Sequence, residues 1–588
     1  MPPRILPQPC SRKLFLAAVW LTSVHAAASE PVIDADFPGG NILLERIEDD
    51  TAYLRQDLRD TEGWWFYWYF RVRGAAGQTL TFNFTNRNVI GLQGPAISLD
   101  TGSTWSWLGR QAVAGTSFSY TFGADADDVR FAFAMPYTEA DLNRFLATHE
   151  NNPHLRVETL AQDRSGRDVE LLRAGKLDGE PRYRVALTAR HHACETMASW
   201  ALEGILDAVL SDTEDGRWFR ENVEVVAVPF MDKDGVEAGD QGKNRRPHDH
   251  ARDYTGEAIY PTVQALKDFL PTWSEGKLRI ALDLHSPYIR DDDIFWVLNP
   301  DEPYQTNTRA FLSVLSDVQQ GPLTYSPAND RLWPTSWGDR EKTNFGWTRT
   351  VPGVQVSAAL EMPYSTNAGM QVTPDNARAF GRDIAAAVRQ YHRSTLAIDF
   401  GTATGDGQPG YSRFNRTNGE RGETSSPQSE TFATIFGTGG TVTVSLRAMD
   451  GNLEWRNRGE VTNHPMGDML EALVAGVFGG QSGGDLQMTL SDLEPGSYQI
   501  TTYHHDPLTI EGRINVHVQD ALGSHADVVT DLLQSAGYDN PDVAEATFQF
   551  VANGTDDIVI TFDQTGYSEH EYGTPAAVLS GFTLKRDP

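Results

Sequence analysis

The sequence contains little cysteine and little positive charge, and each shortage excludes a class of protein. Only 2 of the 588 residues are cysteines, Cys10 and Cys194, so a framework of disulfides is excluded. Lysine and arginine together number 49 against 80 acidic residues. The resulting net charge of −31 argues against nucleic acid and anionic membrane surfaces as partners.

Long apolar runs are also scarce, and the one near the start is too short to cross a membrane. Leu14 to Val24 is apolar and follows the basic residues Arg4, Arg12 and Lys13. This order is typical of a secretion signal. We therefore predict a cleavable signal peptide at residues 1–28, a periplasmic or secreted protein, and no membrane span. Removal of the signal would leave Cys194 as the one cysteine.

The length of 588 residues exceeds that of one domain, and the composition changes twice along the chain. Residues 29–137 read as alternating aromatic strands and predict an N-terminal β-sandwich, beginning with a dense aromatic strand at 64–70. Such aromatic residues usually form a core, and the alternative is a sugar-stacking platform. Residues 396–588 are rich in Gly, Ser and Thr with short strands, which predicts a second all-β domain, a sandwich or jelly roll.

Residues 138–395 alternate between strand-like and helix-like runs, which predicts an α/β domain with a mixed, largely parallel sheet. Strands are expected at 182–189, 223–228, 278–284 and 354–360. Helices are expected at 138–149, 196–210, 261–269, 307–317 and 374–391. The chain is thus expected to be multidomain, with the α/β domain in the middle.

His192 and Glu195 lie where the first of these strands ends and a helix begins, a usual place for binding groups in an α/β sheet. An imidazole and a carboxylate three positions apart can hold one Zn²⁺, with a third ligand from elsewhere and a fourth position for water. The alternative is a surface histidine and glutamate at a helix start.

Three later segments place polar residues at strand ends. His285 directly follows the strand at 278–284 and is either a third metal ligand or a structural histidine. Glu361 directly follows the strand at 354–360 and is either a general base or a salt-bridge partner. The loop after 223–228 is basic, and it is either solvated or supplies donors for a substrate carboxylate and an oxyanion. Its cations are Lys243, Arg245, Arg246 and Arg252.

Taken in order, these motifs resemble the zinc metallocarboxypeptidase family. The closest branch is the cytosolic carboxypeptidase-type subfamily with its bacterial secreted relatives, which has a β-sandwich before the catalytic domain. The resemblance covers residues 32 to about 395. It rests on His192-x-x-Glu195, Asp234-Gly235 with the basic loop, Asp283-x-His285-Ser286, the strand ending in Glu361, the aromatic run at 65–72, and Pro136-Tyr137-Thr138.

The resemblance implies one zinc ion on His192, Glu195 and His285. It implies that Glu361 is the base that activates water at the zinc and later protonates the leaving group. Arg245 would polarise the scissile carbonyl and hold the oxyanion, and Arg252 would bind the terminal carboxylate of the substrate.

This sequence departs from the family before the second arginine, where Ala251 replaces the usual asparagine. The change removes one donor to a terminal carboxylate, which His248 or His250 could replace. Tyr288 and Tyr325 are the candidates for the family's substrate-capping tyrosine. Cys194 is expected to be a small packed residue and not a ligand.

Three functions compete. The first is a zinc hydrolase that cleaves a C-terminal residue from a peptide. The second is a zinc amidase or esterase acting on a non-peptide substrate such as a decorated polysaccharide, which Ala251 and the appended β-domain favour. The third is a catalytically silent binding protein, against which the presence of a base argues. The C-terminal domain either binds a glycan or packs against the catalytic unit. Side-chain specificity and oligomeric state stay open.

Overall fold

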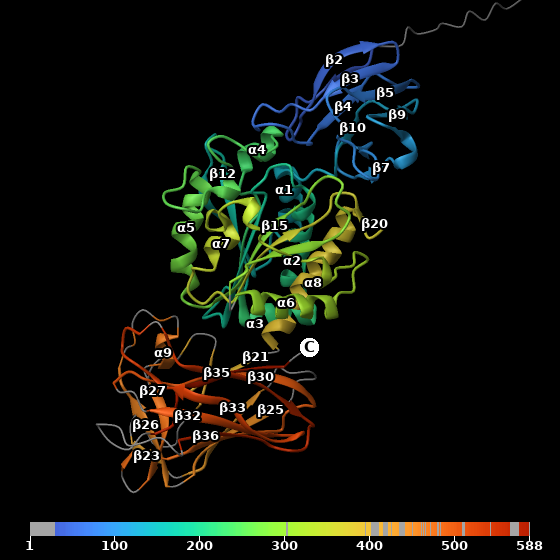
Figure 1. The fold of residues 1–588 in the computed structure, drawn as a ribbon. Coiled ribbons are helices and arrows are strands. Elements are labelled where there is room, and N and C mark those ends of the chain that lie inside the picture. Colours follow the sequence, from blue (N-terminus) through green and yellow to red (C-terminus); the bar gives the residue numbers. More distant parts are fainter. Residues whose placement is uncertain are drawn as a thin grey trace, which may run out of the picture.

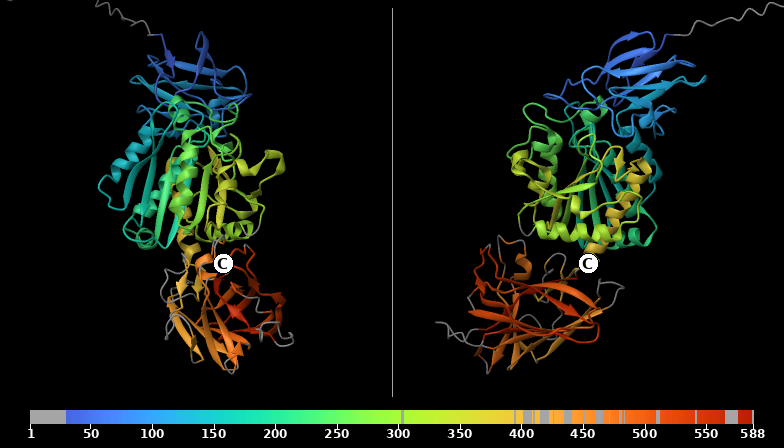
Figure 2. Two further views of the ribbon diagram at one scale, coloured as in Figure 1. Left: turned by 90° about the vertical axis from the view of Figure 1, so that its left-hand side faces the viewer. Right: turned by 45° about the vertical axis from the view of Figure 1, so that its right-hand side comes forward.

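In the computed structural model, the chain forms three parts that follow one another in space as in sequence (Figure 1). Two further views show the same order, with strands at each end and the α/β part between them (Figure 2). The structure describes residues 30–586 except 302–303, 394, 401–407, 409–410, 415–421, 425, 434–440, 450, 460, 462–463, 465, 471, 479–480, 483, 509–511, 541 and 565–575. The predicted signal peptide at 1–28 lies outside these residues.

The N-terminal part consists of two five-stranded sheets that pack face to face. One has the order β1 (Val32–Asp34), β4 (Tyr69–Arg73), β10 (Val129–Ala132), β6 (Ala96–Ser98), β7 (Ser106–Trp107). The other has the order β2 (Leu43–Glu48), β3 (Thr51–Arg55), β5 (Thr79–Phe84), β9 (Ser117–Thr121), β8 (Val113–Ala114). Phe70 and Phe131 of the first meet Phe82 and Phe118 of the second, with ring centroids 5.2–5.3 Å apart across the two sheets. The alternating aromatic residues therefore form a core.

The aromatic run at 64–70 is only partly a strand, because β4 begins at Tyr69. The residues before it are buried at 66–68 and partly buried at 64–65, and side chains supply partners for the backbone groups of Trp65 and Tyr67. The Tyr67 N–H donates to Gln241 Oε1 at 2.7 Å, and Gln241 Nε2 donates to the Tyr67 carbonyl at 3.0 Å. Gln56 Nε2 donates to the Trp65 carbonyl at 2.6 Å. A residue 174 positions away thus takes the place of a neighbouring strand.

The central part is built on an eight-stranded mixed sheet whose middle is parallel. Its order is β11 (Leu155–Gln162), β12 (Asp168–Gly175), β14 (Val223–Val228), β13 (Tyr183–Ala189), β15 (Leu278–His285), β18 (Val356–Glu361), β16 (Phe295–Leu298), β17 (Arg331–Leu332). The pairs β14–β13, β13–β15 and β15–β18 are parallel, while β12–β14 and β16–β18 are antiparallel. The predicted α/β region with a largely parallel centre is present.

Helices cover both faces of this sheet. They are α1 (Glu139–Thr148), α2 (Met197–Leu210), α3 (Glu214–Asn222), α4 (Lys233–Ala238), α5 (Pro261–Ser274), α6 (Tyr304–Val318), α7 (Asn344–Thr348) and α8 (Pro374–Arg393). A Cβ atom on Gly204 of α2 would lie 2.0 Å from the Arg378 carbonyl of α8. The absence of a side chain there lets the two helices touch along their backbones. No described helix has both the length and the apolar character that a membrane crossing requires.

One hydrophobic core runs without a break from Ile33 in the N-terminal sheets to Tyr391 in α8. It crosses the expected boundary at 137–138, so the N-terminal sheets and the α/β layers share one buried interior. A second core, which includes Leu266 of α5 and Ala281 of β15, covers the other face of the sheet. The domain boundaries themselves stay a prediction.

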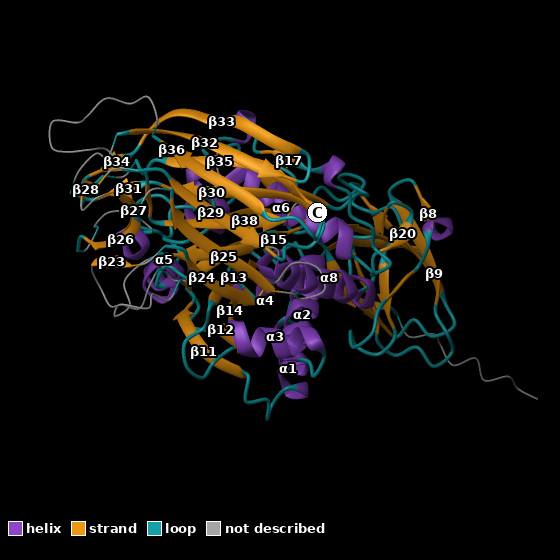
Figure 3. Ribbon diagram, turned by 90° about the horizontal axis from the view of Figure 1, so that it is seen from below, coloured by secondary structure: helices purple, strands orange, loops and turns teal. Residues whose placement is uncertain are grey.

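The C-terminal part has its own core, from Leu396 to Leu584, and consists largely of antiparallel strands. Figure 3 shows the contrast with the helix-rich central part. One sheet has β22 (Ser412–Arg413), β21 (Thr395–Asp399), β38 (Gly581–Arg586), β30 (Gly496–Tyr503), β35 (Glu545–Ala552). A second has β24 (Gln428–Ala433), β25 (Thr441–Ala448), β29 (Leu486–Ser491), β36 (Ile558–Asp563), β32 (Arg513–Asp520), β33 (Gly523–Leu533). A third contains β23 (Gly422–Thr424), β26 (Asn452–Asn457), β27 (Ala472–Phe478), β28 (Gln481–Ser482), β37 (Val578–Leu579).

Gln241 offers a test of the joint between the first two parts. Replacing its fully buried amide in Gln241→Ala leaves the Tyr67 N–H and carbonyl without partners. A buried polar group left unpaired costs about 1–3 kcal/mol, so we expect the free energy of unfolding to fall by about 2–4 kcal/mol. Urea unfolding measures this. The exposed Gln320→Ala is the matched control, and an equal effect in both variants would contradict the bridging role.

Candidate active site

The predicted site residues meet at the carboxyl end of three adjacent parallel strands, a common ligand position in α/β sheets. The strand β13 leads into the turn that carries His192 and Glu195. His285 is the last residue of β15 and Glu361 the last of β18, and the two are register partners across that parallel pair. Strand register therefore places a histidine and a glutamate that are distant in sequence side by side.

His192, Glu195 and His285 form a buried group whose ligand atoms all lie within 4.8 Å of one another. Glu195 joins them, because its Oε1 lies 2.8 Å from His192 Nδ1 and its Oε2 lies 2.6 Å from His285 Nδ1. Two imidazoles and one carboxylate are the donor set of many catalytic zinc sites, whereas Ca²⁺ would need more oxygen ligands. The residues present thus fit a zinc ion.

Each of these histidines has a carboxylate at its other ring nitrogen. His285 Nε2 lies 2.8 Å from Asp283 Oδ2, and His192 Nε2 lies 3.7 Å from Asp249 Oδ2. The Asp283 carboxylate holds the N–H at Nε2 of His285 and turns the Nδ1 lone pair toward the shared centre, which is the usual support of metal-binding histidines. Asp249 is too far from His192 Nε2 for a hydrogen bond and acts there through its charge. The sequence signal for Asp283 was its place two residues before His285, but nothing singled out Asp249.

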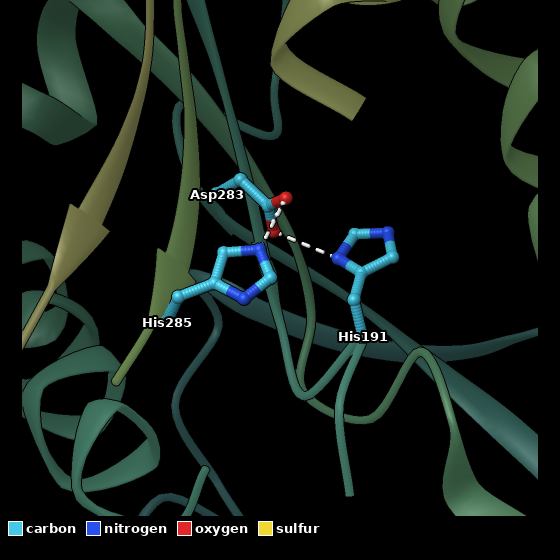
Figure 4. A group of neighbouring side chains, drawn as sticks. All are labelled: His191, Asp283 and His285. Atoms are coloured by element: carbon cyan, nitrogen blue, oxygen red, sulfur yellow. Dashed lines mark hydrogen bonds and ion pairs between the residues drawn. The ribbon is translucent and has the colours of Figure 1, made fainter. Parts of the chain in front are cut away.

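Asp283 also connects to a second imidazole, as Figure 4 shows. Its Oδ1 lies 2.8 Å from His191 Nδ1 and accepts a hydrogen bond from Thr188 Oγ1 at 2.8 Å. The remaining nitrogen of His191 lies 2.7 Å from Tyr254 Oη. His191, Asp283 and His285 are also close enough to hold a metal, but both His191 nitrogens have protein partners. We therefore interpret His191 as a positioning residue.

Arg190 holds the turn that presents His192 and Glu195. It adopts a positive φ of 61° and is 2% exposed. Its guanidinium donates to the Ala193 carbonyl at 3.0 Å and to the Tyr137 carbonyl at 2.8 Å. These bonds give partners to one carbonyl of the turn and to one of the segment before α1, and so tie the turn to that segment. No pattern in the sequence predicts this role of Arg190.

Charges in the group shift one another's protonation. Burial alone would raise the pKa of Glu195, but His192, Lys243 and His285 outweigh it and hold that pKa well below its usual value. Burial would lower the pKa of His285, yet Asp283 and Glu195 raise it well above the usual value. The carboxylates around the histidines therefore favour positive charge in this group, and a metal dication bound there would replace protons on the histidines.

Glu361 faces the same cavity and is partly buried, and its buried Oε2 has no hydrogen-bond partner among the described residues. Burial, together with the charge of Glu195, raises its pKa to about 7. A carboxylate with that pKa and an unused oxygen can take up and release a proton near neutral pH.

A cavity of about 410 Å³ opens over these residues. Its wall combines His192, His285 and Glu361 with several aromatic rings, among them Trp65, Tyr288 and Trp333. Arg252 lines it as well, with its guanidinium carbon 4.9 Å from the Trp333 ring centroid. Within the part of the chain that the structure describes, no carboxylate lies within ion-pair distance of that guanidinium. Burial lowers the pKa of Arg252. The cavity therefore presents a partly buried cation with no ion-pair partner among the described residues.

The structure does not bring two of the predicted residues to this cavity wall. Arg245 is held by Asp60, Asp232 and Asp240 at 3.0, 2.7 and 2.9 Å. The His250 ring stacks on Tyr260, with centroids 3.5 Å apart. Arg245 is drawn away because three carboxylates converge on it, and His250 because its ring packs on an aromatic neighbour.

The other residues considered from the sequence also divide into those that line the cavity and those that lie elsewhere. Ala251 lines the cavity, but His248, considered as a substitute donor, lies 2.6 Å from Asp253 and outside the wall. Tyr288 lines the cavity and is 44% exposed, while the Tyr325 hydroxyl donates to Asp330 at 2.6 Å elsewhere. Cys194 is buried and accepts from Trp65 Nε1 at 3.1 Å. Burial raises the pKa of its thiol to about 12, as suits a packed residue.

Comparisons with known proteins agree with this geometry. Residues 142–286 match the family described as zinc carboxypeptidase. Cytosolic carboxypeptidase 2 of Xenopus tropicalis is 29% identical over 203 residues, which are 32% of this chain and 21% of that protein. Its Homo sapiens counterpart is 30% identical over 241 residues, 38% of this chain and 26% of the relative. The chain thus spans about a quarter of the length of these curated relatives.

A solved structure shows the fold over a longer stretch. The metallo-carboxypeptidase from Burkholderia cenocepacia has a TM-score of 0.53 and 22% identity, covering 61% of this chain and 98% of its own. The matched 61% of this chain is longer than the α/β region alone, so the similarity of fold extends beyond that region. Residues 142–286 of this chain thus match the zinc carboxypeptidase family model, and the fold around the cavity of histidines and carboxylates is similar to that of the bacterial metallo-carboxypeptidase.

Proposed function

We propose that this protein is a zinc-dependent carboxypeptidase that removes a C-terminal residue from a peptide. The observation that carries the proposal is Arg252, a partly buried cation with no carboxylate at ion-pair distance among the described residues, in the same cavity as the His–Glu–His group. A substrate that brings its own carboxylate would supply that partner. The names of the relatives, cytosolic carboxypeptidases, support the same class.

In this proposal His192, Glu195 and His285 hold one zinc ion. Zinc bound there would polarise a carbonyl oxygen and acidify a water molecule. Asp283 keeps the His285 imidazole oriented through its hydrogen bond at Nε2, while the charge of Asp249 acts at Nε2 of His192. The buried turn held by Arg190 fixes the spacing between His192 and Glu195.

Glu361 is the proposed base. Its free Oε2 accepts the proton of the attacking water and later delivers it to the leaving nitrogen as the C–N bond breaks. Desolvation of the carboxylate, together with repulsion by Glu195, raises its pKa and keeps its affinity for a proton high. Both directions of transfer are therefore accessible near neutral pH.

Arg252 is the proposed anchor for the terminal carboxylate, and the aromatic wall receives the adjacent side chain. A guanidinium offers two parallel N–H donors that match a carboxylate. Ala251 contributes a methyl group and no donor, and His248 and His250 lie outside the wall. The carboxylate grip thus depends on Arg252 more than it would with an asparagine at 251.

We also propose export of the protein, on the sequence of residues 1–28 alone.

The metal ligands can be tested by composition. His285→Ala removes a nitrogen ligand and leaves Asp283 and Glu195 facing a gap. We expect this variant to lose most of its zinc after dialysis, as measured by atomic emission. His525→Ala, an exposed histidine of the C-terminal part, should keep the wild-type content. Full zinc occupancy in His285→Ala would exclude His285 as a ligand.

The base can be tested by an isosteric change. Glu361→Gln should keep its zinc but lose about 10²–10⁴-fold in kcat, because an amide cannot accept the proton of the attacking water. Steady-state kinetics on a free C-terminal peptide gives the value, with the exposed Glu257→Gln as control. Turnover near that of the wild type would rule out Glu361.

The anchor can be tested on both partners. Peptides with an amidated C-terminus should be poor substrates. Arg252→Met should raise KM at least tenfold for peptides with a free C-terminus, because removal of one partner from a buried charge pair typically costs about 2–5 kcal/mol. The amidated peptides should be insensitive to the variant. Equal cleavage of free and amidated peptides by the wild type would overturn the carboxypeptidase proposal.

A further inference from the structure

Two cations of the same loop lie in opposite surroundings. Arg245 is engaged on Nε, Nη1 and Nη2 by the carboxylates of Asp60, Asp232 and Asp240. Burial alone would lower its pKa, but these acids raise it above the usual value. Turning Arg245 toward a substrate would leave three partly or fully buried carboxylates without their cation, which is costly. Arg245 therefore serves as a bridge between Asp60 of the N-terminal part and the α/β part.

Lys243, two residues earlier, lies on the cavity wall. Its Nζ donates to Glu195 Oε1 at 3.0 Å and lies 3.5 Å from His192 Nδ1. The ammonium also lies 4.9 Å from the Trp65 ring centroid, an attractive cation–π position. The charge of Glu361 acts on it as well. This cation thus stands between two predicted metal ligands and the proposed base.

We infer that Lys243, and not Arg245, is the cation that stabilises the negative charge on the carbonyl oxygen of the substrate. The inference rests on the proposed function. As the water oxygen bonds to the carbonyl carbon, the C=O electron pair moves to oxygen, and the Lys243 ammonium donates a hydrogen bond to it without losing a proton. Collapse restores the C=O bond and expels the nitrogen, which receives its proton from Glu361.

The chemistry of lysine suits this position. An ammonium on a four-carbon stem carries three rotatable donors, so Lys243 can exchange Glu195 for a substrate oxygen without disturbing the turn. The ring of Trp65 limits how far the stem swings. A rival role is structural, in which Lys243 only steadies the Glu195 carboxylate. The two roles differ in what happens to the metal when Lys243 is removed.

The test compares Lys243→Met and Lys243→Arg with Lys176→Met, a lysine at the end of β12 that faces Asp178. Each variant is assayed for kcat and KM on a free C-terminal peptide, and zinc affinity is measured by competition with a chelator. We expect Lys243→Met to bind zinc at least as tightly as the wild type and to lose about 10²–10³-fold in kcat, with KM changed less than about threefold. Lys243→Arg should recover most of that loss, and Lys176→Met should match the wild type.

Several outcomes would overturn the inference. Unchanged kcat in Lys243→Met would do so, as would a loss of activity that follows a loss of zinc, since that marks a structural role. An equal kcat loss in Arg245→Lys, with stability and zinc retained, would return the role to Arg245. If the wild type hydrolyses no peptide, the proposed function itself fails. An active wild type with an equally active Lys243→Met contradicts this inference alone.

Discussion

The carboxylate of Asp283 is the contact on which the geometry of the cavity depends. It lies in β15, beside β13, and accepts hydrogen bonds from Thr188, His191 and His285. A buried charge of this kind is stable only when its oxygens are fully bonded. The bonds that satisfy Asp283 also fix the orientation of the His285 ring and the position of the ligand turn. The register of the sheet therefore also determines the geometry of the proposed metal site.

Charge is distributed unevenly in this acidic protein, and the cavity uses the imbalance. Glu195, Asp249, Asp283 and Glu361 are gathered around two imidazoles, so positive charge is attracted to the centre. Arg252 lies within the field of the same acids but outside ion-pair distance, which leaves it open to an incoming anion. The same surroundings can thus hold a cation at the centre and an anion at the rim.

The sequence predicted the parts of the site that local pattern determines. His192 and Glu195 share one turn, and His285 and Glu361 each end an apolar strand, so the strand ends alone bring them together. The different surroundings of Lys243 and Arg245 were not predictable from the sequence. They depend on Asp60, which comes from 185 positions earlier, and on where the loop meets the N-terminal sheets. The aromatic run at 64–70 was misread for the same reason, because Gln241 replaces a strand partner.

The helix α8 ends at Arg393 and the strand β21 begins at Thr395, so a single residue joins the α/β domain to the C-terminal sheets. Tyr183, the first residue of β13, stacks on His392 near the end of α8, so this junction lies at the amino edge of the parallel strands. The cavity lies at their carboxyl edge, where Trp65 of the N-terminal part contributes to its wall. Any contact that the C-terminal sheets make with a ligand would therefore lie at the edge of the central sheet opposite to the cavity.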